Sequence, residues 1–127
     1  FQFAAGTTDR AEHDSIEKLC CEAIDRPLAM YHKNSACHQS SLEWPEMRSV
    51  ANDECAKGVA VLEKRIDGKE FWLGNFFSVP DIICGHCAGW AISLGFSIPQ
   101  SNEVSGSLKR VRRRKALKIA MERTRAK

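Results

Sequence analysis

The residues best suited to chemistry are the six cysteines, because thiolates bind metals, form disulfides and act as nucleophiles. Two of them stand in the motif Cys84-Gly85-His86-Cys87. A spacing of three residues places both sulfurs on one side of a helical turn, where they can bind one zinc ion. A tetrahedral site needs two further ligands, and the segment around residue 37 offers Cys37 with His38, or Cys37 with His32. One hypothesis is therefore a structural zinc site of Cys84, Cys87, Cys37 and His38.

The same four residues resemble the active-site tetrapeptide of protein disulfide isomerases. This resemblance covers only the tetrapeptide and implies a thiol oxidoreductase that uses the Cys84–Cys87 pair. Such a site needs its thiols at a helix N-terminus, where the helix dipole lowers the thiol pKa. The flanking apolar periodicity instead places the motif inside a helix, which counts against this alternative.

The even number of cysteines supports a further alternative, a disulfide-stabilised secreted or organellar protein that binds a protein or an anionic membrane. Against it, Cys20, Cys55 and Cys87 fall on apolar helical faces, where a reduced thiol packs as a small hydrophobic side chain. The compartment stays open: nuclear, cytoplasmic or organellar for reduced thiols, and secreted for disulfides.

The second chemical feature is a concentration of positive charge toward the C-terminus. Residues 107–127 hold ten Lys or Arg and one acidic residue, whereas the other 106 residues hold nine basic and fifteen acidic side chains. The net charge is therefore +9 in the segment and −6 in the remainder. Clustered cations bind phosphate groups, with a steep dependence on salt concentration. We expect nucleic-acid contacts from Lys109, Arg110, Arg112, Arg113, Arg114, Lys115, Lys118, Arg123 and Arg125.

This charge distribution favours a non-enzymatic nucleic-acid-binding protein, with RNA as the expected polyanion and a ribonucleoprotein or other larger assembly as its setting. The alternatives are a solvated tail, a nuclear-localisation signal, a membrane-surface patch, and docking onto the acidic body of the same chain or of another subunit. The sequence has no phosphate-binding glycine loop, Ser-His-Asp elbow or paired helical carboxylates, so enzymatic activity has no positive support. It also has no apolar run of the roughly 20 residues that a membrane span requires.

The elements that would position these groups are mainly helical. Apolar residues recur at helical spacing over residues 16–24, 47–66 and 83–94, which predicts about three core helices. Residues 14–17 have the spacing of a capping box, and Pro27 is expected to end the first helix near Arg26. Residues 28–44 are then an irregular connection. Ser78, Pro80 and Asp81 predict the start of the third helix.

Two further segments modify this helical pattern. Residues 70–79 are rich in aromatic side chains and predict a short extended segment or hairpin, with an aromatic loop packed over the helices as the alternative. Gly85, Ala88 and Gly89 give the third helix a small-residue side, which would let another backbone approach closely. The sequence thus predicts a small helical domain with one aromatic extension.

Length and turn-forming residues divide the chain. At 127 residues a single hydrophobic core is expected, formed by a cysteine-rich, mainly helical body over residues 1–100. Ser, Asn and Gly in residues 101–106 predict a linker. Residues 107–127 are rich in helix formers, but repulsion among their cations predicts an arm that becomes helical when counter-charge neutralises it. The predicted fold is a mainly α domain with a basic C-terminal helical arm.

Overall fold

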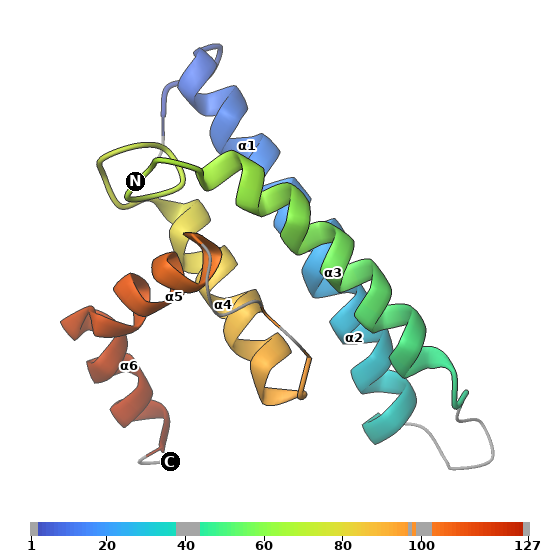
Figure 1. The fold of residues 1–127 in the computed structure, drawn as a ribbon. Helices are drawn as coiled ribbons and strands as arrows, with labels where there is room; N and C mark the ends of the chain where they lie inside the picture. The colour runs from blue at the N-terminus through green and yellow to red at the C-terminus, as the bar shows by residue number, and fades with distance from the viewer. Residues whose placement is uncertain (1–2, 38–43, 97, 99–102, 126–127) are drawn as a thin grey trace.

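Helices make up most of the computed structural model, which describes residues 3–37, 44–96, 98 and 103–125 (Figure 1). The side chains of Cys37 and Arg125 lie outside this description. The predicted mainly α fold is confirmed. The elements are α1 (Thr8–Cys20), η1 (Cys21–Asp25), α2 (Arg26–His32), η2 (Lys33–Cys37), α3 (Met47–Ile66), α4 (Val79–Ser93), α5 (Glu103–Arg113) and α6 (Lys115–Arg125), of which η1 and η2 are π-helical.

The elements from α1 to η2 form one continuous helical rod, seen in Figure 1. Thr7 caps its start, so the predicted capping box at residues 14–17 is wrong. Pro27 does not end the helix, because the wider π-helical turn η1 precedes it and Arg26 N–H donates to the Cys21 carbonyl five residues back. This turn accommodates a residue that has no N–H of its own. Residues 28–37 are therefore helical rather than irregular.

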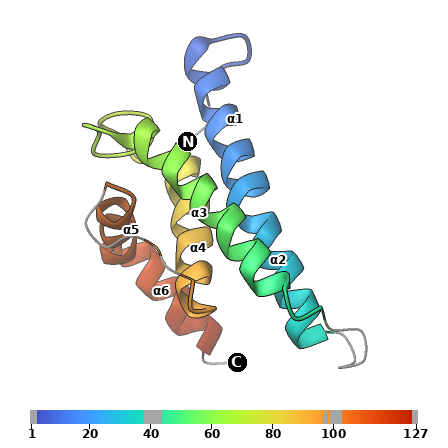
Figure 2. The same cartoon turned by 45° about the vertical axis from the view of Figure 1, so that its right-hand side comes forward.

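Helix α3 runs antiparallel beside the rod, as Figures 1 and 2 show. It covers the same range, residues 47–66, over which apolar spacing predicts a helix. Gly58 lets the two backbones approach, since a Cβ added there would lie 2.6 Å from the Ala23 carbonyl oxygen. The buried residues that the rod and α3 contribute to the core are Ile16, Cys20, Ile24, Leu28, Ala51, Cys55, Val59, Leu62 and Ile66.

Helix α4 packs against α1 and η1 and carries the cysteine motif. It starts after Ser78, and the buried Asp81 carboxylate accepts hydrogen bonds from the Ser78 N–H and hydroxyl, both at 2.8 Å. The same carboxylate accepts a third hydrogen bond from Trp72 N–H at 3.2 Å. The predicted helix start is confirmed, and Asp81 also ties α4 to the aromatic segment.

The aromatic segment before α4 is a tight turn. Phe71 and Gly74 exchange two backbone hydrogen bonds of 2.8 and 3.0 Å and form an isolated antiparallel bridge. Trp72 points into the core and is fully buried. Within the described ranges, extended pairing is limited to this bridge, so the predicted extension is much shorter than residues 70–79.

Helix α5 joins the basic segment to the core. It begins at Glu103, so residues 103–106, predicted as linker, are helical. Val104, Leu108 and Val111 are buried, and the helix packs against α4 and α3. A Cβ added at Gly85 of α4 would lie 3.0 Å from a Val111 methyl, so the small-residue side of α4 accepts α5. The first half of the basic segment is therefore part of the packed body.

Candidate functional site

The two faces of α5 differ in character. Its buried face carries Val104, Leu108 and Val111, whereas Lys109, Arg112 and Arg113 are exposed on the other side. A helix held by its apolar face presents its cations in fixed positions, which reduces the conformational entropy lost when they bind an anion. Three of the four expected cations of α5 are thus exposed on a helix whose other face is buried, whereas Arg110 is half-buried.

Arg114 separates α5 from α6 and lies outside both helices. Its guanidinium carbon is 3.6 Å from the centroid of the Phe77 ring, a cation–π contact that fixes the bend. Helix α6 then presents Lys115 and Lys118 on one side and Leu117 and Met121 toward α4, in agreement with helical spacing. The predicted arm is therefore two helices with a bend between them.

The cations of α5 and α6 have no carboxylate partners within the part of the chain that the structure describes. Ion pairs there all join residues between 10 and 69. The Nε and Nη2 atoms of Arg110 are enclosed and also lack a hydrogen-bond partner among the described residues. The acidic body therefore leaves eight described cations without a carboxylate partner. Arg110 is half-buried, and the other seven are exposed: Lys109, Arg112, Arg113, Arg114, Lys115, Lys118 and Arg123.

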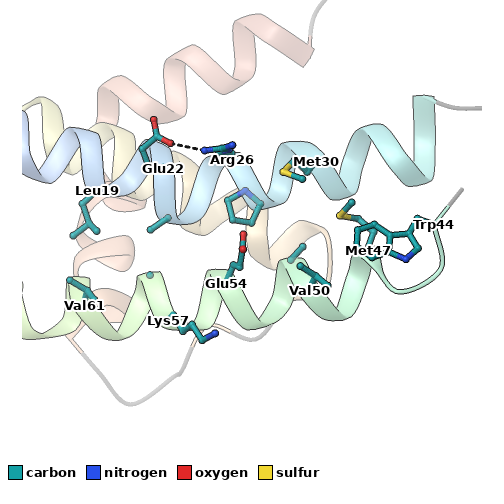
Figure 3. Close-up of a pocket in the computed structure, with 14 residues that line it drawn as sticks. Leu19, Glu22, Arg26, Met30, Trp44, Met47, Val50, Glu54, Lys57 and Val61 are labelled. Carbon is teal, nitrogen blue, oxygen red and sulfur yellow. Dashed lines mark hydrogen bonds and ion pairs between the residues drawn. The ribbon is translucent and has the colours of Figure 1, made fainter.

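Two of the grooves that the described residues form have volumes that suit a ligand group. The first lies between the rod and α3, has a volume of about 570 Å³, and is shown in Figure 3. Its charges are mixed: Arg26 pairs with Glu22 at 3.3 Å, and Glu54 lies near Lys57 on α3. It thus has no excess positive charge. The second groove, of about 610 Å³, lies between α4 and α6 and includes Arg112.

The thiols gather inside the body rather than at its surface. Cys20 on α1 interacts with Cys84 and Cys87 on α4, and Cys55 on α3 is buried nearby. Hydrogen bonding to Cys84 and burial raise the pKa of Cys20, and hydrogen bonding to Cys20 and burial raise the pKa of Cys87. Raised pKa values keep these thiols protonated and therefore poor nucleophiles at neutral pH.

This arrangement bears on the three cysteine hypotheses. Cys84 and Cys87 lie inside α4 rather than at its N-terminus, and the raised pKa of Cys87 is opposite to what a thiol oxidoreductase needs. Each cysteine whose side chain is described carries a free thiol. The zinc site stays a prediction, because His38 and the Cys37 side chain lie outside the described residues. The structure instead places Cys20 beside the motif. Cys20 lies four residues after Ile16 on the same core-facing side of the helix, and this spacing was the one sequence signal of that position.

Native-state labelling should separate exposed Cys21 from the four buried cysteines among the described residues. We expect a thiol-alkylating reagent to modify Cys21 at least about 100-fold faster than Cys20, Cys55, Cys84 or Cys87, because a buried thiol reacts only after the helices open. Mass spectrometry of peptides from the folded protein measures the rates, and the same reaction in denaturant is the control. Rapid labelling of Cys84 or Cys87 in the folded protein would contradict the packing of α4.

Helix α1 carries a cluster of potential metal ligands. This cluster was not predicted from the sequence. Among the described residues, His13, Asp14 and Glu17 are the group whose potential ligand atoms lie within 4.8 Å of one another. Arg10 Nε donates to both Asp14 oxygens, at 2.7 and 2.8 Å, and lowers the Asp14 pKa; His13 Nδ1 lies 3.0 Å from the same carboxylate. With Asp14 engaged in this way, the cluster is an ion-pair network of one helix.

No family model and no curated protein sequence matches the chain. Within the described residues, every helix is too short or too polar to cross a membrane. Functional inference therefore depends on the chemistry of the molecule itself, and its most distinctive feature is the set of unpartnered cations on the described parts of α5 and α6.

Proposed function

We propose that this chain is a non-enzymatic nucleic-acid-binding protein, with RNA as its expected ligand, and that it acts as a subunit of a ribonucleoprotein or other larger assembly. The backbone phosphates lie along the exposed sides of α5 and α6. The observation that carries the proposal is that eight described cations of these helices and the bend between them have no carboxylate partner among the described residues, although residues 1–106 have a net charge of −6.

Rigid support distinguishes these cations from those of a solvated tail. A tail loses conformational entropy when each side chain binds, whereas the cations of α5 stand on a helix whose other face is buried. Phosphate contacts of this kind position a nucleic acid but do not read its sequence. We therefore expect binding that depends on salt and varies little with base composition.

The test removes charge without removing packing. In the variant R112Q/R113Q/K115Q/K118Q all four altered side chains are exposed, so the fold should persist. We expect the dissociation constant for a labelled 20-nucleotide RNA to rise at least about tenfold near 0.15 M salt. The slope of log affinity against log salt should fall by about three, since each lost phosphate contact on a single strand contributes about 0.7. Fluorescence anisotropy measures both quantities.

A matched variant controls for net charge. K18Q/R26Q/K57Q/K64Q removes the same number of cations from exposed positions of the rod and α3. Its affinity and salt slope should stay close to those of the unmodified chain. Equal losses in both variants would show that only total charge matters, and no loss in the first variant would refute the proposal.

A further inference from the structure

The groove between α4 and α6 combines apolar walls with cations. Ile82 and Met121 stand on opposite sides of it and are 50% and 49% exposed, with Trp90 and Leu117 as further lining residues. Gly85 and Gly89 of α4 also line it, and neither adds a side chain at its position. The space of about 610 Å³ lies within the range of small-ligand sites in proteins.

A smaller apolar cavity of about 280 Å³ continues the groove toward the bend. The two share Ile82, Val111 and Leu117. Arg112 lines the larger space and Arg114 the smaller one, and both cations lack a carboxylate partner in the described part of the chain. The groove and the cavity thus form one elongated apolar surface, with the Arg112 guanidinium in the groove and the Arg114 guanidinium in the cavity.

Charge complementarity defines the occupant. Apolar walls exclude a simple inorganic anion, and the two guanidinium groups disfavour a neutral apolar ligand. A nucleotide fits both conditions, because its base has apolar faces and its phosphates are anionic. The bases of a duplex are stacked on one another, so only an unpaired base can enter such a groove without the cost of unstacking.

We propose that this groove accepts an unpaired base while Arg112 and Arg114 bind the flanking phosphates, so that the chain binds single-stranded nucleic acid in preference to duplex. This inference rests on the proposed function and specifies its ligand. Base contact with Trp90, Ile82 and Met121 adds to the phosphate contacts and is tolerant of base identity. A duplex can make the phosphate contacts but not the base contact.

The critical variant fills the groove and keeps every cation. A Cβ at Gly89 would meet only the flexible end of Arg112, at 3.4 Å, so Gly89→Leu projects into the groove without disturbing the core. We expect its affinity for a 12-nucleotide single strand to fall about tenfold, the effect of one lost base contact, while its affinity for a 12-base-pair duplex changes less than twofold. The control is Ala60→Leu, which adds similar bulk on an exposed position of α3 outside both grooves.

Crosslinking of the unmodified chain gives an independent measurement. A single strand containing 4-thiouridine should crosslink to His86, Trp90 or Met121 under long-wavelength light, as identified by peptide mass spectrometry. Crosslinks confined to residues outside the groove would overturn the inference. So would equal binding of single strand and duplex, or an unchanged single-strand affinity in a folded Gly89→Leu protein.

The outcomes distinguish this inference from the broader proposal. If the exposed-cation variant loses affinity but Gly89→Leu does not, phosphate binding stands and the groove has no role in it. If neither variant changes RNA affinity, both this inference and the proposed function fail. An acidic helical peptide that binds the groove more tightly than the single strand would instead assign this surface to a protein partner.

Discussion

Replacing Asp81 with alanine is expected to lower the free energy of unfolding by about 3–5 kcal/mol, which is large for a single substitution. The Asp81 carboxylate is fully buried and accepts hydrogen bonds from Ser78 N–H, Ser78 Oγ–H and Trp72 N–H. Removing it leaves three donors without an acceptor, and each buried unsatisfied donor costs roughly 1–3 kcal/mol. It also removes a negative charge from the positive end of α4.

Chemical denaturation monitored by circular dichroism measures this loss. Asp81→Asn keeps the size of the side chain and one acceptor oxygen, so its loss should be about half as large. Asp53→Ala removes an exposed carboxylate that forms an ion pair with Lys57 at the surface, and should change stability by less than about 1 kcal/mol. An Asp81→Ala protein as stable as the Asp53→Ala protein would contradict the hydrogen-bond network.

Replacing Gly58 with alanine is expected to destabilise the protein by about 2–4 kcal/mol, although alanine favours a helix over glycine by about 1 kcal/mol. The added Cβ would lie 2.6 Å from the Ala23 carbonyl oxygen and 2.8 Å from the Ala23 Cβ. These atoms belong to the rod, so α3 must move away from it, and the core contacts of Cys55, Val59 and Leu62 loosen together. The backbone carbonyl of Ala23 cannot move aside as the end of a flexible side chain can.

The matched control is Gly89→Ala, the same substitution at another helical glycine. Its Cβ would meet only the end of Arg112, so stability should stay the same or rise by up to about 1 kcal/mol. Thermal and chemical denaturation of both variants should therefore give changes of opposite sign or very different size. Equal effects would show that helix propensity alone decides both, and that the rod and α3 are less closely packed than these distances indicate.

The sequence predicts those features that depend on local pattern. The bounds of α3 follow from the apolar spacing over residues 47–66, and the start of α4 follows from Ser78, Pro80 and Asp81. The rod could not be predicted from proline rules, because η1 widens the helix before Pro27 and tertiary packing of Leu28 stabilises α2. Local propensity was overridden there by burial.

The candidate site was partly visible in the sequence. The run of cations is a local property, so its residues could be named, and the helical spacing of Val104, Leu108 and Val111 could have shown that α5 has a buried face. The groove could not be named, because it arises from the approach of α4 and α6 on either side of the bend at Arg114. Likewise, Cys20 meets Cys84 only through the packing of α1 against α4.

The dual character of α5 limits how the basic segment can be handled outside this protein. A synthetic peptide of residues 107–127 would contain all ten cations, yet Leu108 and Val111 would lose the core that holds them. Grafting the peptide onto a carrier would reproduce attraction to polyanions but neither the α4 wall nor the geometry of the bend. Cutting the chain within α5 would likewise expose core residues, so loss of binding in such a fragment would also reflect loss of fold.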